Sequence, residues 1–132
     1  MKKEIIPSLI LTALAAVLAA GSQTFLSPCV HEDGSFGACH WAGRTLAGLS
    51  CVLGVLAALS LCAGRARLGT YLSALPVSAM GILTPGVVIG LCPMSTMRCR
   101  MVMQPAMRIL FSAALLFALA GAIACAGEKE TK

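Results

Sequence analysis

Charged residues are scarce in this chain. Of its 132 residues only 11% are Asp, Glu, Lys or Arg, and five of these are acidic. A soluble domain of this size normally devotes about a quarter of its residues to charge. With 58% hydrophobic residues, the chain cannot cover its whole surface with polar groups. We therefore exclude a water-soluble globule and expect that lipid covers part of the surface.

Aromatic residues are also few, at 5%, whereas Ala, Leu and Gly are abundant. Small and aliphatic side chains suit helices that pack closely in a membrane. The sequence has no Pro-rich, Ser-rich or charge-rich linker and no repeat of solenoid period. We therefore expect one domain over residues 1–132.

Catalytic constellations are missing as well. The sequence shows no paired carboxylates, no Gly-rich phosphate loop and no nucleophile–base arrangement, so we assign no catalytic residue and expect no cofactor. No acidic residue falls within an apolar span, which argues against a proton-coupled transporter. The net charge of +5 does not indicate nucleic acid, because the basic residues lie at segment ends and not on one face with stacking aromatics.

Four apolar segments dominate the sequence. They run over about 5–25, 41–63, 68–91 and 105–126. Each has about 20 residues, which as a helix crosses a hydrocarbon core of about 30 Å. Backbone amides in lipid must be satisfied within their own segment, so we expect helices and not strands. The predicted fold is all-α: an integral membrane bundle of four transmembrane helices with short Cys-rich extracytoplasmic loops.

The third span differs from the others because proline and glycine interrupt it. Pro76, Gly81, Pro85, Gly86 and Gly90 all fall within residues 68–91. Proline removes an intrahelical hydrogen bond, so we expect this span to be bent or broken. Broken helices line substrate sites in some transporters. With only four spans, we favour a kink that packs against neighbouring helices.

Basic residues at the segment ends indicate the orientation. The amino terminus, the turn at 64–67 and the tail at 128–132 carry six of the ten basic residues, so we place both termini in the cytoplasm. The first span also resembles a secretory signal peptide, but its apolar run exceeds the usual length of about 7 to 15 residues. In either case the segments 26–40 and 92–104 face outward.

Seven cysteines are the most informative residues of the chain. Cys29 and Cys39 lie in the first outward segment, and Cys92 and Cys99 lie in the second. An even number of exported cysteines favours disulfides. Four cysteines allow three pairings, and the sequence leaves the connectivity open. Cys51, Cys62 and Cys125 lie inside predicted helices, where a thiol packs as a small apolar group.

Two alternatives to structural disulfides remain. Thiol–disulfide exchange is compatible with four spans and two exported cysteine pairs, although the Cys-x-x-Cys motif of such enzymes is missing. Soft-metal binding is the other, because thiolate, thioether and imidazole together suit Cu(I). Its candidate ligands besides the cysteines are His31, His40, Met94 and Met97, with Met101 and Met103 nearby.

Arg44 and Arg108 each lie about one turn inside an outward helix end. Their aliphatic stems suit apolar surface while the guanidinium reaches the headgroups. The alternative is that they contact an anionic headgroup, Glu32, Asp33 or a partner protein.

Several short motifs resemble a known family. Cys39-His40-Trp41 opens the second span, and Cys92-Pro93-Met94 with Thr96-Met97-Arg98-Cys99 closes the third. These resemble small four-span bacterial membrane proteins catalogued as a domain of unknown function, family 4418. The resemblance implies a location in the bacterial inner membrane and no established activity. Genes of the family commonly lie beside export-type transporter permeases, which implies an accessory role.

These observations predict a multi-pass membrane protein with disulfides across its outer loops. We expect it to be a non-enzymatic accessory or interaction subunit whose partners are the lipid bilayer and a transporter permease or other membrane protein.

Overall fold

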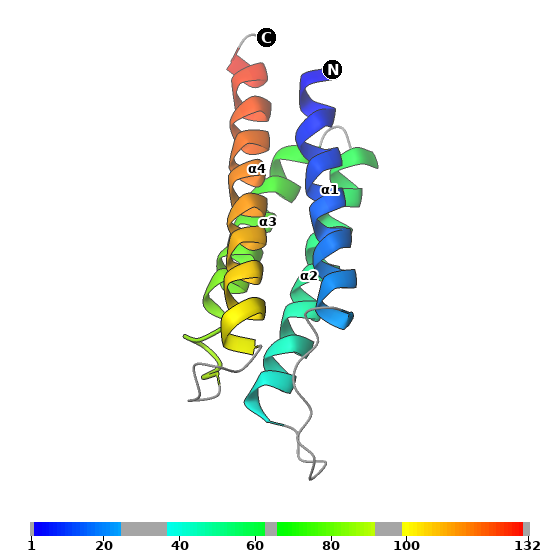
Figure 1. Ribbon diagram of the computed structural model, residues 1–132. Coiled ribbons are helices and arrows are strands. Elements are labelled where there is room, and N and C mark those ends of the chain that lie inside the picture. Colours follow the sequence, from blue (N-terminus) through cyan, green and yellow to red (C-terminus); the bar gives the residue numbers. More distant parts are fainter. Residues whose placement is uncertain (1, 25–36, 63–65, 92–98, 131–132) are drawn as a thin grey trace.

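The computed structural model describes residues 2–24, 37–62, 66–91 and 99–130. Its elements are α1 (Lys2–Gln23), α2 (Ala38–Cys62), α3 (Arg67–Leu83), the π-helix η1 (Cys99–Met103) and α4 (Gln104–Glu130). The four α-helices form an up-down-up-down bundle (Figure 1). The all-α prediction with four helices is therefore confirmed.

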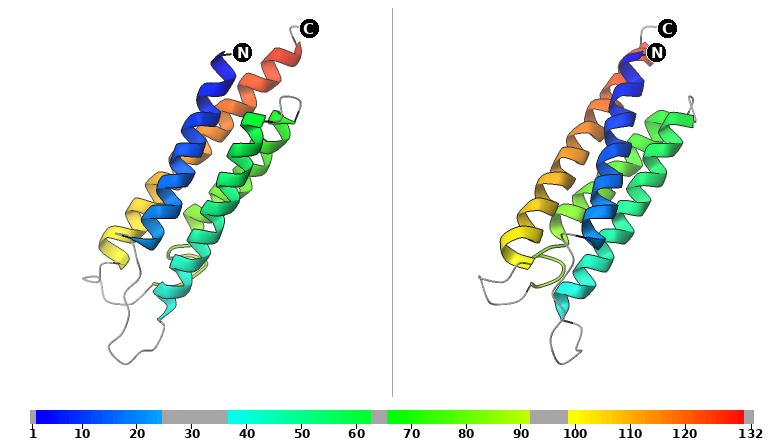
Figure 2. Two further views of the ribbon diagram at one scale, coloured as in Figure 1. Left: turned by 90° about the vertical axis from the view of Figure 1, so that its right-hand side faces the viewer. Right: turned by 45° about the vertical axis from the view of Figure 1, so that its right-hand side comes forward.

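Each helix packs against two neighbours. α1 contacts α2 and α4, and α3 contacts the same two helices, so the four helices close into a ring. Both ends of the chain lie at one end of the bundle (Figures 1 and 2). We call the opposite end the distal end. There α2 begins, α3 ends and η1 leads into α4.

Three helical segments are long and apolar enough to cross a membrane. They are Ile5–Gln23, Ala38–Cys62 and Arg100–Gly127. α3 is shorter: its 17 residues span about 25 Å at 1.5 Å per residue. The prediction of multiple membrane-spanning helices is confirmed for three of the four segments.

The third predicted span is broken, as expected. Its helix ends at Leu83 and not at residue 91, because Pro85 has no N–H to continue the helical ladder and Gly86 adopts a positive φ of 100°. Residues 84–91 fold back in a tight turn. Within it Val87 and Val88 donate to the Leu83 carbonyl, and Gly86 donates to Ile89.

The core combines alanines with larger apolar side chains that recur every three or four residues. η1 contributes Met103, α4 contributes Met107, Phe111, Ala114, Ala118 and Ala122, and α2 contributes Ala42, Leu46, Leu53 and Ala57. This spacing is typical of helices that pack at shallow angles. Other apolar side chains, such as Val55, Leu116 and Ile123, are exposed on the outside. An apolar exterior of this kind is what a surrounding bilayer requires.

Close packing depends on the smallest residues. A Cβ at Gly54 would lie 3.7 Å from the Cβ of Ala15, so α1 and α2 approach in ordinary van der Waals contact there. Gly81 of α3 lies against the ring of Phe111, and Gly121 of α4 lies against the ring of Tyr71. α3 and α4 therefore interlock at two levels.

Candidate functional site

The polar chemistry of the described residues gathers at the distal end, around the point where α3 breaks. The Thr84 amide and hydroxyl both donate to the Met80 carbonyl, so they complete the last turn of α3. Beyond it the Pro85 carbonyl has left the helical ladder. It needs a donor from elsewhere in the molecule because Pro85 itself is fully buried.

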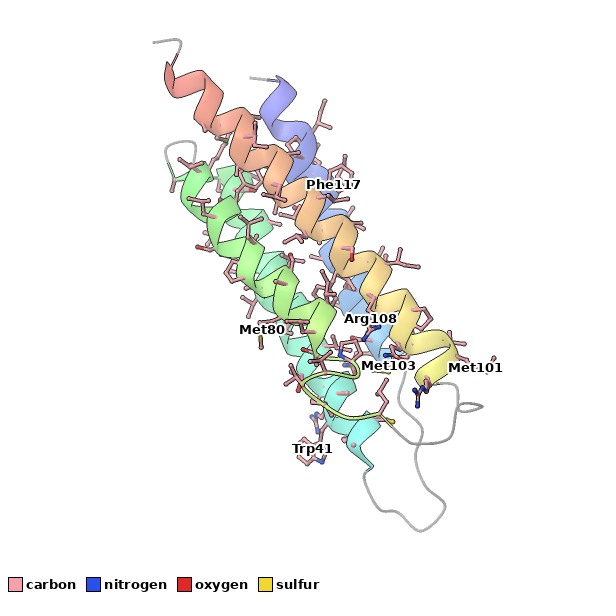
Figure 3. The ribbon with its side chains drawn as sticks, turned by 90° about the vertical axis from the view of Figure 1, so that its left-hand side faces the viewer. Trp41, Met80, Met101, Met103, Arg108 and Phe117 are labelled. Atoms are coloured by element: carbon pink, nitrogen blue, oxygen red, sulfur yellow. The ribbon has the colours of Figure 1, made fainter. Side chains whose placement is uncertain are left out.

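Two side chains of α4 supply those donors. Arg108 Nη2 donates to the Pro85 carbonyl at 3.1 Å, and Gln104 Nε2 donates to the same oxygen at 3.3 Å. The guanidinium thus lies at the C-terminal end of α3, where a positive charge complements the helix dipole. Figure 3 shows Arg108 reaching from α4 toward the turn that follows α3.

Gly86 permits this approach. A Cβ at Gly86 would lie 2.6 Å from Gln104 Nε2 and 3.4 Å from Arg108 Nη2. Its positive φ is also one that residues with a side chain rarely adopt. Both the positive φ and the close approach of Gln104 therefore require glycine at position 86, and both occur where the turn contacts α4.

An open groove of about 410 Å³ lies beside this contact. Arg100, Gln104 and Arg108 line it together with Pro105 and Ile109. The three polar residues are spaced four apart, so they follow one face of η1 and the start of α4. The groove therefore combines two guanidinium groups and a carboxamide with an apolar wall.

The distal end is electropositive within the described residues. Arg44 is exposed on α2, Arg100 is exposed on η1, and Arg108 is half-buried on α4. None of the side chains that the structure describes is acidic. The Nε atom of Arg108 is buried and has no hydrogen-bond acceptor among the described residues. Among the described residues, the groove therefore holds positive charge that no acidic side chain balances.

The predicted disulfide cysteines fall largely outside this description. Cys39 is buried in the first turn of α2, with 1% of its surface exposed. Cys29, Cys92 and the side chain of Cys99 lie outside the described residues, so the pairing stays a prediction. No disulfide joins any two of the four cysteines whose side chains are described. Cys51 and Cys62 face outward from α2, whereas Cys125 is half-buried against the core.

The predicted metal ligands are not brought together within the described residues. His40 is half-buried and lies edge-on to Trp41, with ring centroids 6.0 Å apart. Met103 belongs to the hydrophobic core, while Met101 is 65% exposed. His31, Met94 and Met97 lie outside the described residues. Across the described part, no three His, Cys, Asp or Glu residues could hold a metal ion. Copper binding and thiol exchange stay untested hypotheses.

Arg44 and Arg108 share the distal end but differ in environment. Arg44 is exposed, whereas Arg108 is held by the Pro85 carbonyl. Sequence reasoning did not identify Gln104, Gly86 or the Pro85 carbonyl as parts of the site. Two signals were present: the Thr84-Pro85-Gly86 break, and the spacing of four between Arg100, Gln104 and Arg108.

A comparison with protein families returned one match. The model of a family described as a domain of unknown function (DUF4418) matches residues 11–125. The resemblance drawn from the cysteine motifs is therefore confirmed over most of the chain. Neither a search of curated proteins nor a search of solved structures gave a match.

Proposed function

We infer a function from the premise that this chain belongs to the DUF4418 family, and from the polar distal end of its bundle. The protein is a four-span subunit of the bacterial inner membrane without enzymatic activity of its own. Both termini are cytoplasmic, and the distal end faces outward. There the chain contacts a partner membrane protein, such as a transporter permease.

The placement of the two termini supports this topology. Both lie at one end of the bundle, so α1 and α3 end, and α2 and α4 begin, toward the opposite end. α3 packs between α2 and α4, and its turn over 84–91 extends it toward the distal end. A helix of about 25 Å with such an extension suits a core of about 30 Å.

Disulfides among Cys29, Cys39, Cys92 and Cys99 are part of the proposal. Burial of Cys39 favours a structural bridge over exchange, because a buried sulfur is shielded from attacking thiolates. Bridges at this end would hold the start of α2 near the end of α3. The connectivity among the four cysteines stays open.

The observation that carries the accessory role is the exposed surface of the distal end. Trp41 on α2 is 59% exposed, and Met101 on η1 is 65% exposed. Arg44 and Arg100 are exposed at the same end. Aromatic, methionine and arginine side chains are the types enriched where proteins meet.

Site-specific photocrosslinking in native membranes tests the partner. We expect a benzophenone amino acid at Met101 to crosslink to one integral membrane protein, identified by mass spectrometry. The same group at Val55, which is 60% exposed on the middle of α2, serves as the matched control and is expected to label lipid. If Met101 labels only lipid or a second copy of this chain, the accessory role is wrong.

A further inference from the structure

We propose that the groove at the start of α4 binds the phosphate of an anionic phospholipid, with Arg108 and Arg100 as its cationic ligands. This requires that the bundle crosses the membrane, but not that it binds a partner protein. The inference thus uses only the membrane part of the proposed function.

The groove has more hydrogen-bond donors than the described residues accept from. A guanidinium carries five N–H donors, and Arg108 is recorded donating one of them, to the Pro85 carbonyl. Its Nε finds no acceptor among the described residues. Arg100 is exposed, and its five donors are not engaged by any described residue. Gln104 has a second amide hydrogen beyond the one that it gives to Pro85.

Among the residues that the structure describes, no acidic side chain offsets the positive charge of the groove. Arginine stays protonated at any physiological pH, so Arg100 and Arg108 bring two positive charges to the groove. No acidic side chain is described at this end of the bundle. Beside a bilayer these charges are weakly screened, and an anion would offset the cost of holding them there. A phosphate, with its several acceptor oxygens, matches the planar fork of a guanidinium.

The position of Arg108 is fixed before any ligand arrives. Its guanidinium is held at the Pro85 carbonyl, which Gln104 also contacts, and Gly86 leaves the space that both side chains occupy. Arg108 thus has a structural role at the end of α3. The hydrogen bond from Nη2 to the Pro85 carbonyl fixes the orientation of the whole guanidinium group. Preorganised donors of this kind bind an anion without further loss of side-chain entropy.

The apolar wall distinguishes a lipid from a free anion. Pro105 and Ile109 line the groove beside the arginines, and Ile109 is 68% exposed. Val102 is 47% exposed on η1 next to them. The groove lies at one end of the candidate span Arg100–Gly127, which is the depth of lipid headgroups. Free phosphate would gain nothing from this wall, whereas acyl chains would cover it.

Retention of phosphatidylglycerol by the full chain tests the proposal. The protein is reconstituted in phosphatidylcholine nanodiscs with graded amounts of phosphatidylglycerol, and retained lipid is counted by native mass spectrometry. We expect one phosphatidylglycerol retained per chain and about tenfold weaker retention in Arg108→Gln, because a charge-assisted hydrogen-bond pair is lost. The matched control is Arg44→Gln, which removes the same charge from an exposed position at the same end.

Arg108→Gln also removes a hydrogen bond to Pro85 and can destabilise the fold, so Arg100→Gln is the second variant. Arg100 makes no described contact with the turn, and we expect its loss to weaken retention at least about threefold without lowering helicity. Equal weakening by Arg44→Gln, or no preference for phosphatidylglycerol over phosphatidylcholine, would overturn the proposal. Full displacement of the lipid by millimolar inorganic phosphate would identify a free-anion site and would also overturn it.

The two experiments fail independently. If the chain retains no phosphatidylglycerol, Met101 can still crosslink to a partner protein. If Met101 gives no protein crosslink, the chain can still retain phosphatidylglycerol selectively.

Discussion

Ser8 and Tyr71 form a hydrogen bond in the centre of the bundle. The Ser8 Oγ and Tyr71 Oη atoms are 2.5 Å apart, and both side chains are buried. The contact joins α1 to α3, which face each other across the ring of helices. When the helices separate in a bilayer, the two hydroxyl groups have no water to bond with, but they form hydrogen bonds with other polar groups. Because the bond is partly replaced, we expect it to contribute only modestly to stability.

We expect Tyr71→Phe to lower the free energy of unfolding by about 1 kcal/mol. Phenylalanine keeps the ring that packs against Gly121, so the change removes only the hydroxyl. The measurement is reversible unfolding in mixed micelles followed by circular dichroism. A double-mutant cycle with Ser8→Ala isolates the pair, and strictly additive losses would show that the hydrogen bond does not form.

Several other polar side chains in the helices donate to a backbone carbonyl of the same or the preceding helix. Ser50 donates to the Leu46 carbonyl, and Ser60 donates to the Ala57 carbonyl. Arg67 Nε donates to the Ser60 carbonyl, so the C-terminal end of α2 receives a guanidinium as the end of α3 does. At the C-terminal ends of both α2 and α3, an arginine of the following α-helix thus donates to a backbone carbonyl. These contacts explain why arginines are tolerated at the ends of apolar spans.

At the scale of the elements, α3 and α4 interlock by exchanging glycines and aromatic rings. Gly81 of α3 lies against Phe111 of α4, and Gly121 of α4 lies against Tyr71 of α3. Neither site has room for a methyl group without displacing a ring. The spacing of these two helices is therefore fixed by van der Waals contact, since lipid offers no hydrophobic force to press helices together.

Gly81→Ala should consequently lower the free energy of unfolding by about 1–3 kcal/mol, the usual cost of overpacking a core. The matched control is Gly48→Ala on α2, where a Cβ would meet nothing within 4 Å. There we expect no loss, and a gain of up to about 1 kcal/mol because alanine favours helix. Equal effects of the two substitutions would contradict the interlock.

For the whole molecule, the decisive feature is the shared location of the two termini. An even number of crossings follows if α3 crosses the membrane with the three longer spans. The distal end would then lie, as a unit, on the side of the membrane opposite both termini. The cysteines of the proposed disulfides and the electropositive groove would share that side.

Reporter fusions test this arrangement. We expect alkaline phosphatase joined after Gly90 to be active, because it is exported, and the same enzyme joined after Ala66 or Lys132 to be inactive. Fluorescent protein fusions at the same positions give the opposite pattern and control for expression. Equal phosphatase activity after Ala66 and after Gly90 would show that α3 does not cross the membrane, and an inactive phosphatase after Gly90 would remove the basis for disulfides on the distal end.

Much of this architecture could be predicted from the sequence. Three long apolar segments and the break at Thr84-Pro85-Gly86 follow from composition and from backbone chemistry. The predicted starts of the first two helices were three residues late, at Ile5 and Trp41, because helix ends at an interface carry weak signals. The motifs around Cys39 and Cys92 identified the family.

The inward face of each helix could not be predicted in this way. In water an apolar stripe marks the buried face, but in lipid both faces are apolar and the period disappears. Here small residues such as Ala114 and Ala118 are buried, while Leu116 and Ile123 face outward. Large side chains such as Phe111 are buried as well, so neither hydrophobicity nor size alone separates inside from outside.

The sequence by itself determined that this protein is a bundle of apolar helices, because so few charges leave no other solvent than lipid. Only the tertiary structure decided where its arginines act. Arg108 meets the Pro85 carbonyl across 23 residues of chain, and Gly86 admits it. No local sequence pattern encodes that contact, because it depends on the distance between α3 and α4. The packing of aromatic rings against glycines sets that distance.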